Sequence, residues 1–262
     1  MSSQKFAGKV VIVTGSSSGI GQGIALLLGQ QGASVTIHGR SVEGLQETER
    51  LMIENGVDAD RILIVQGEIE SPKTAEKLVE ETLKKFGKID VLVNNAGLGT
   101  KTGTEQDSEE MLDYIFEVNL KSIIRLNKMV IPHLEKTKGN IVNISSITSL
   151  KAFTIDSFYP MSKASLDHYM RHIAPTLGPK GIRMNNLNPG LVQTNFFNRY
   201  DGKVSYDEIA ERFVTNEVPL GRAGSARDMA NAVSYLASDE ASYVTGITLA
   251  VDGGALLGNP GK

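Results

Sequence analysis

A tyrosine and a lysine lie four residues apart in the stretch Ser157–Ala164, whose sequence is Ser-Phe-Tyr-Pro-Met-Ser-Lys-Ala. On a helix, residues i and i+4 lie on one face, one turn apart. A phenol with a pKa near ~10 is a poor acid or base at neutral pH, but a neighbouring ammonium group favours the phenolate. Tyr159 and Lys163 are therefore predicted to form a pair capable of acid–base chemistry near neutral pH. Because such a pair also arises by chance, its meaning depends on the residues placed around it.

A Gly/Ser-rich turn follows the first apolar run, residues 10–13, and precedes a helical pattern. Residues 14–21 have the sequence Thr-Gly-Ser-Ser-Ser-Gly-Ile-Gly. Glycines permit close approach of the backbone to a pyrophosphate, and the helix N-terminus offers free N–H groups. The spacing differs from the general G-x-G-x-x-G fingerprint. A turn without a ligand is the alternative, but the position between strand and helix favours dinucleotide binding. The expected contacts are Gly15, Ser17, Ser18, Gly19 and Ile20.

The second apolar run, residues 34–38, leads into Gly39, Arg40 and Ser41. An acid at this place would bind the adenosine ribose and select NAD, whereas an arginine accommodates a 2′-phosphate. Glu43, the nearest acid, is expected in the next helix, and Gly39 leaves space. Arg40 suits bidentate phosphate binding, the alternative being a solvated surface residue. We therefore predict NADP(H) as cofactor, with NAD(H) as the alternative.

Short β-branched runs alternate with helical patterns along the whole chain. This alternation predicts βαβ units and a doubly wound parallel sheet. With no linker or repeat, we expect one α/β domain over residues 1–262. The connections 98–107 and 191–217 should leave carboxyl ends of strands, where ligands bind, and residues 191–217 are expected to form a substrate-binding loop or lid. The expected strands cover residues 10–13, 35–37, 62–65, 91–93, 141–144, 183–187 and 248–251; the expected helices cover 19–31, 42–55, 72–86, 108–135, 157–178 and 226–237.

Composition excludes several classes of function. The net charge of -3 and the pI of about 5.9 argue against nucleic-acid partners and anionic membrane surfaces. The absence of cysteine excludes disulfides, zinc–thiolate sites and a catalytic thiol. No apolar run approaches the roughly 18 residues of a membrane span. We therefore expect a soluble, cytoplasmic protein. The histidines form no metal-binding pattern, so we expect no metal site; they are His38, His133, His168 and His172.

A set of ordered motifs resembles the classical short-chain dehydrogenases/reductases over nearly the whole chain. The resemblance implies a Rossmann-type, doubly wound, seven-stranded parallel sheet with strand order 3-2-1-4-5-6-7, flanked by helices. It also implies an oxidoreductase, but it does not indicate the substrate. The motifs are Thr14-Gly15…Gly19-Ile20-Gly21, Asn94-Asn95-Ala96-Gly97, Asn119 within Glu117-Val118-Asn119-Leu120, Ser145-Ser146, Tyr159…Lys163, Asn188-Pro189-Gly190…Thr194 and Val244-Thr245-Gly246…Val251-Asp252-Gly253-Gly254.

The resemblance implies a catalytic role for four residues. Tyr159 would be the general acid in carbonyl reduction and the base in alcohol oxidation, and Lys163 would lower its pKa and hold the nicotinamide ribose. Ser146 would hydrogen-bond the substrate oxygen, with Ser145 as the rival. Asn119 would anchor a water that links Lys163 to solvent. The alternative interpretation of Asn119 is a buried polar side chain with a structural role, which needs a hydrogen-bond partner.

The resemblance also implies further cofactor contacts. Asn95, Ala96 and Gly97 would lie on the adenosine side, and Pro189, Gly190, Val192 and Thr194 would line the nicotinamide end. Glu68 and Ile69 would lie beside the adenine. Glu68 departs from the family pattern, in which Asp is commoner. Pro160 is a further departure, which the first turn of a helix tolerates.

Apolar side chains in the expected nicotinamide-side loops suggest a pocket for a small, moderately hydrophobic carbonyl or secondary alcohol. Packing between the loops is the alternative for each of them. We predict an NADP-dependent oxidoreductase, with an epimerase or dehydratase and a catalytically silent cofactor-binding protein as alternatives. The resemblance also implies a homo-oligomer, a tetramer or dimer. The apolar residues are Leu98, Phe153, Ile155, Phe196, Phe197 and Tyr200.

Overall fold

The computed structural model describes residues 4–152, 157–194, 196 and 206–258. Within these ranges the chain forms a seven-stranded sheet of order β3-β2-β1-β4-β5-β6-β7, in which all strand pairs are parallel. The predicted fold class and strand order are confirmed. The strands are β1 (Val10–Val13), β2 (Ser34–Gly39), β3 (Ile62–Gln66), β4 (Val91–Asn94), β5 (Asn140–Ile144), β6 (Arg183–Pro189) and β7 (Thr248–Val251).

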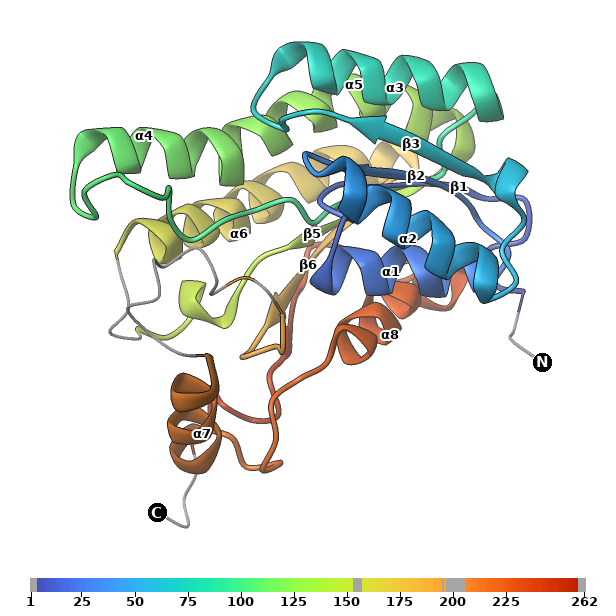
Figure 1. The fold of residues 1–262 in the computed structure, drawn as a ribbon. Coiled ribbons are helices and arrows are strands. Elements are labelled where there is room, and N and C mark those ends of the chain that lie inside the picture. The colour runs from blue at the N-terminus through green and yellow to red at the C-terminus, as the bar shows by residue number, and fades with distance from the viewer. Residues whose placement is uncertain (1–3, 153–156, 195, 197–205, 259–262) are drawn as a thin grey trace.

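Helices cover both faces of the sheet (Figure 1). On one face lie α1 (Gly19–Gln30), α2 (Val42–Glu54) and α8 (Ala226–Ala237). On the other lie α3 (Pro72–Phe86), α4 (Glu109–Phe116), α5 (Ser122–Thr137) and α6 (Phe158–Leu177). Each helix of the described chain is too short or too polar to span a membrane.

The central strands supply side chains to two hydrophobic cores. In β1, Val11 and Val13 pack into the core beneath α1 and α8, whereas Ile12 packs into the core beneath α3 and α5. β4 alternates in the same way, with Leu92 on the Ile12 side. Side chains of a strand point alternately to opposite faces, so a strand covered on both faces needs an uninterrupted apolar run. This double burial explains the apolar runs.

The helix expected over residues 108–135 is interrupted by a π-helical turn, Glu117–Lys121. The N–H of Ser122 donates to the carbonyl of Glu117, five residues earlier, instead of the usual four. Asn119 lies in this turn and is fully buried. The apolar periodicity alone indicated one continuous helix, because a single π turn introduces no glycine or proline signal.

A further helix, α7 (Tyr206–Glu217), lies within the segment expected as a long loop. Phe213 and Val214 of α7 pack against a small core of Ile147, Val218 and Ala255. In Figure 1 this helix lies apart from the two helical layers. α7 is therefore attached to the turn that follows β5 and to the C-terminal segment rather than to the main cores.

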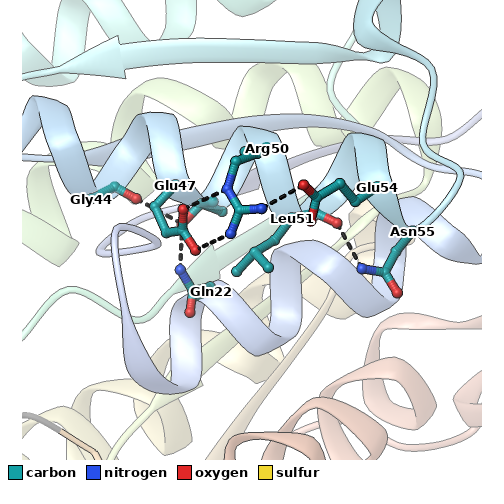
Figure 2. A network of polar contacts seen from close by, with 8 residues as sticks. Gln22, Gly44, Glu47, Arg50, Leu51, Glu54 and Asn55 are labelled. Atoms are coloured by element: carbon teal, nitrogen blue, oxygen red, sulfur yellow. Dashed lines mark hydrogen bonds and ion pairs between the residues drawn. The ribbon is translucent and has the colours of Figure 1, made fainter.

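Figure 2 shows a network of polar contacts along α2, which Gln22 of α1 joins. Arg50 contacts Glu54 and places its Nη2 2.7 Å from Glu47 Oε1. Exposed ion pairs of this kind contribute little to stability. Thr48 connects α2 to the ligand-binding edge of the sheet. Its hydroxyl accepts from Gln22 Nε2 at 2.9 Å, and its one proton is shared between the carbonyls of Ser16, at 2.8 Å, and Gly44, at 2.9 Å. Thr48 thereby ties α2 to the turn after β1.

Candidate active site

A cavity of about 470 Å³ lies at the carboxyl ends of the strands, beside the point where the strand order reverses between β1 and β4. Open α/β sheets bind ligands at this place. The cavity brings together most of the residues that sequence reasoning selected, from seven separate segments of the chain. Those on its wall are Gly15, Ser17, Ser18, Gly19, Ile20, Arg40, Ile69, Asn95, Ala96, Gly97, Ser146, Tyr159, Lys163, Pro189, Gly190, Val192 and Thr194.

Ser41, Glu68 and Asn119 are not on that wall. The Ser41 hydroxyl caps α2: it accepts the N–H of Gly44 at 3.0 Å and donates to Glu43 at 3.0 Å. A capping role occupies the hydroxyl that was expected to meet a phosphate. Beside Ile69 it is Glu70, not Glu68, that lines the cavity.

The turn after β1 is built from glycines in strained or crowded positions. Gly15 and Gly19 have φ values of 66° and 58°, which glycine adopts without penalty. A Cβ added to Gly21 would lie 2.4 Å from both the Gly15 carbonyl oxygen and Asn95 Nδ2. Asn95 Nδ2 in turn donates to the carbonyls of Thr14 and Gly15, at 2.9 and 3.0 Å. The end of β4 therefore holds the turn closed, and the turn presents its backbone to the cavity as a cradle.

We expect Gly21→Ala to lower the free energy of unfolding by about 2 kcal/mol and to weaken binding of the predicted cofactor, NADPH, at least about tenfold, because the new methyl group overlaps the turn. Denaturant unfolding and a fluorescence titration with NADPH measure the two effects. Gly178→Ala is the matched control, since its added Cβ would meet nothing within 4 Å. Wild-type affinity in Gly21→Ala would contradict the cradle.

The end of β2 places a histidine and an arginine beside this turn. His38 Nδ1 accepts the N–H of Gly15 at 3.3 Å, and burial lowers the pKa of His38 to about 4, so the imidazole is neutral at pH ~7. A Cβ on Gly39 would lie 2.9 Å from Ser17 Oγ, so Gly39 makes room for the protein's own turn. Arg40 is exposed on the cavity wall, and its guanidinium has no partner among the described residues.

The Tyr159–Lys163 pair lies at the start of α6, as predicted. Lys163 Nζ lies 5.7 Å from the centre of the Tyr159 ring and donates to the Ile144 carbonyl at 2.8 Å. Burial lowers the pKa of Lys163 to about 8, and the negative charge of Asp167 opposes this shift. Lys163 is therefore mainly an ammonium at neutral pH. The Tyr159 ring packs 5.5 Å from that of Phe196, measured between centroids.

The two serines after β5 have different hydrogen bonds. Ser145 Oγ donates to the backbone carbonyl of Lys163 at 3.3 Å, which directs it toward α6. Ser146 Oγ accepts the N–H and the hydroxyl of Thr148, at 3.2 and 3.0 Å. Of the two, Ser146 is therefore the hydroxyl whose proton remains for a ligand.

Asn119 holds the loop after β4 against α6. Its Oδ1 accepts the N–H of Leu98 at 3.0 Å, and its Nδ2 donates to the Leu98 carbonyl at 2.8 Å and to Ser162 Oγ at 3.0 Å. A Cβ on Gly97 would lie 3.3 Å from both Asn119 Oδ1 and Lys163 Nζ. The π turn thus brings Asn119 next to the lysine, while the predicted relay through a water stays a prediction.

A chain of buried amides connects the strands to α6. Asn94 donates to Asn143 at 2.8 Å, and Asn143 donates to Asn186 at 2.8 Å. Asn186 and Asn188 then donate to the buried carboxylate of Asp167, at 2.7 and 2.9 Å. The network fixes the position of α6 over β5 and β6, and with it the positions of Tyr159 and Lys163. Sequence reasoning missed this network, although asparagines inside buried apolar runs are a signal of hydrogen-bonded partners.

The remaining cavity wall is mainly apolar. Leu98 and Phe196 line it, as the sequence predicted, whereas Phe153, Ile155, Phe197 and Tyr200 lie outside the described residues. Other apolar residues of the wall could not be selected from the sequence, because no local pattern shows which side chains of a helix or loop face a ligand. The apolar wall residues that sequence reasoning missed are Tyr114, Val118, Ile144, Ile147, Leu191 and Phe213.

Comparison with known proteins accounts for this arrangement. A family model described as enoyl-(acyl carrier protein) reductase matches residues 15–255. Tropinone reductase-like 3 from Erythroxylum coca is 36% identical, in an alignment that covers 97% of this chain and 95% of that protein. This chain belongs to the short-chain dehydrogenase/reductase family. Another family member, a 3-oxoacyl-[acyl-carrier-protein] reductase from Thermotoga maritima, is 33% identical over 97% of this chain and 100% of its own length.

The solved structures agree with this family. A short-chain dehydrogenase/reductase from Caenorhabditis elegans, solved with cofactor, superposes with a TM-score of 0.91 and 37% identity, covering 97% of each chain. As a short-chain dehydrogenase/reductase, the protein is an oxidoreductase of carbonyl and CH–OH groups that uses a nicotinamide cofactor. The glycine cradle and the unpartnered Arg40 fit such a cofactor.

Proposed function

We propose that this protein is an NADP(H)-dependent oxidoreductase that interconverts a carbonyl and a secondary alcohol on a small, moderately hydrophobic substrate. The observation that carries the proposal is that Ser146, Tyr159 and Lys163 share one cavity with the glycine cradle of the β1–α1 turn. When bound there, the nicotinamide supplies or accepts the hydride. Residues 191–217 act as the substrate lid of a single domain, and the protein works as a homo-oligomer, a tetramer or dimer.

The side chains of the site move and stabilise the proton. In reduction, Tyr159 gives its proton to the carbonyl oxygen, and in oxidation it takes the proton of the alcohol. Ser146 donates a hydrogen bond to the same oxygen and stabilises the charge that develops on it. Lys163, fixed by the Ile144 carbonyl, is an ammonium below its pKa of about 8 and stabilises the phenolate. Asn119 supports proton return from solvent.

The cavity wall supports an uncharged substrate. The Asp, Glu, Lys and Arg residues of the described wall are Arg40, Glu70 and Lys163. Arg40 and Glu70 lie at the adenosine end and Lys163 belongs to the catalytic group, so the described part of the substrate end carries no further charge of this kind. Apolar side chains such as Leu98 and Phe213 surround that end. Two of the relatives are named a tropinone reductase-like protein and a 3-oxoacyl-[acyl-carrier-protein] reductase, and these names are consistent with reduction of a carbonyl group.

A screen of uncharged ketones and secondary alcohols, followed at the NADPH absorbance band, tests the proposal. Oxidation of NADPH with at least one hydrophobic ketone is expected. Conversion of a substrate without net change in NADPH would favour an epimerase or dehydratase. Tight NADPH binding without any conversion would favour a catalytically silent cofactor-binding protein. Either outcome would overturn the proposed activity.

Cofactor selection is predicted to depend on Arg40. Arg40→Ala should lower kcat/KM for NADPH roughly 10- to 100-fold and leave that for NADH within about threefold, because charge-assisted hydrogen bonds to the 2′-phosphate are lost. Steady-state kinetics with both cofactors measure the ratio. Arg50→Ala, on the outer face of α2, is the matched control. A wild-type preference for NADH, or equal losses with both cofactors, would contradict the phosphate contact.

A further inference from the structure

In the turn after β5, Ser146 Oγ accepts two hydrogen bonds from one residue, Thr148. Ser146 caps the short turn Ile147–Ser149, and its Oγ accepts the N–H of Thr148 at 3.2 Å. A capping bond of this kind is common and needs no particular side chain at the donor position. Thr148 adds a bond that depends on its own side chain, because its Oγ1 lies 3.0 Å from the same Ser146 Oγ as a donor.

A serine hydroxyl has one donor and two acceptor positions. With the N–H and the hydroxyl of Thr148 on the two acceptor positions, only the proton of Ser146 remains. Within the described part of the chain, no protein acceptor is found for that proton. Ser146, Thr148 and Tyr159 all line the cavity, so the Ser146 proton is directed to the space where a substrate oxygen meets Tyr159.

The backbone of Ser146 is held independently of Thr148. Its carbonyl accepts from Asn188 Nδ2 at 2.9 Å and from the backbone N–H of Ser149 at 3.1 Å. The Thr148 hydroxyl is therefore not needed to keep Ser146 in place. What it adds is the orientation and the polarisation of the Ser146 O–H bond, since a hydroxyl that accepts hydrogen bonds becomes a stronger donor.

We propose that Thr148 is a positioning residue for the carbonyl–alcohol reaction: its hydroxyl donates to Ser146 Oγ and directs the Ser146 proton to the substrate oxygen. The inference rests on the proposed function, and it assigns a role to a residue outside the Asn119–Ser146–Tyr159–Lys163 group. Thr148 acts through Ser146, so its effect exists only while Ser146 carries a hydroxyl.

Thr148→Val tests this role, because valine keeps the shape and the backbone N–H and removes only the hydroxyl. On a ketone identified by the screen, kcat should fall roughly three- to tenfold with KM within about twofold of wild type. Thr148→Ser, which restores a hydroxyl, should retain most of kcat. In a Ser146→Ala background, Thr148→Val should have no further effect, since the two residues act as one unit.

Thr148→Ala removes the same hydroxyl and repeats the test if the valine variant folds poorly, and Thr176→Val, on the exposed side of α6, controls for the substitution itself. An unchanged or raised kcat in Thr148→Val would overturn the inference, because Ser146 would then be donating to Thr148. An equal loss in the Ser146→Ala background would also overturn it, by showing a role independent of Ser146. Absence of turnover in the wild-type enzyme would overturn the proposed function as well, whereas an active wild type with an unaffected Thr148→Val overturns the inference alone.

Discussion

Tyr159→Phe is expected to lower kcat for ketone reduction by about 10²- to 10⁴-fold, with NADPH affinity within about threefold of wild type. The substitution removes the phenol proton that the carbonyl oxygen receives. It keeps the aromatic ring, and with it the packing against Phe196 and Lys163 Nζ. Steady-state kinetics on a good substrate and a fluorescence titration with NADPH separate the chemical step from cofactor binding.

Tyr243→Phe is the matched control for this prediction, because Tyr243 is fully exposed. It removes the same hydroxyl far from the chemistry and should leave kcat unchanged. If Tyr159→Phe retained more than about a tenth of wild-type turnover, the assignment of the acid to Tyr159 would be wrong.

Lys163→Met should lower kcat by about 100-fold or more, because the phenolate loses its neighbouring ammonium. The pKa of Lys163 is lowered to about 8, so in the wild-type enzyme the ammonium is present below that pH and is lost above it. Wild-type activity that depends on the ammonium should therefore decline as pH rises through about 8. The residual activity of Lys163→Met should lack this alkaline decline. A pH–rate profile that is the same in both proteins would contradict the role of the charge.

Lys163→Met, which is expected to lower activity, is also expected to raise the free energy of unfolding. Below about pH 8 both folded and unfolded states carry the Lys163 charge, and its burial lowers the free energy of unfolding by about 3 kcal/mol. Between about 8 and the ordinary lysine pKa of 10.5 the unfolded state binds more protons, so this cost disappears as pH rises. The gain in stability of Lys163→Met over wild type should thus be larger at pH ~7 than at pH ~9.5.

Denaturant unfolding at the two pH values measures this difference. Lys84→Met, at an exposed position near the end of α3, is the control and should show no comparable change with pH. A gain that grew with pH would have the wrong sign. The two effects together describe a lysine whose burial lowers stability and supports the reaction.

Much of the site could be predicted from the chain because it depends on local spacing. The four-residue interval between Tyr159 and Lys163 places both on one face of any helix, and the glycines at 15, 19 and 21 permit the tight turn after β1 wherever that turn lies. The end of each apolar run marks the carboxyl end of a strand. In a parallel sheet these ends meet at one edge, which brings distant residues such as Asn95 and Pro189 into one cavity.

Contacts between segments could not be predicted in this way. Ser41 and Glu68 have suitable side chains, but the cap of α2 and the course of the chain after β3 keep them off the cavity wall. Asp167 is one of many acids in the chain, and only the approach of Asn186 and Asn188 identifies it as the anchor of α6.

The sequence by itself determined the fold class, the strand order of the family, the dinucleotide turn and the identities of Ser146, Tyr159 and Lys163. The fold class, the turn and the Tyr159–Lys163 pair follow from periodicity, from the backbone freedom of glycine and from spacing within one element, whereas the strand order and the choice of Ser146 follow from the resemblance to the family. Only the tertiary structure decided that a π turn places Asn119 against the loop after β4, that Ser145 faces α6, and that Thr148 donates to Ser146. The physical reason is that hydrogen-bond partners and buried faces are chosen when separate elements pack together, and that choice leaves no local pattern in the chain.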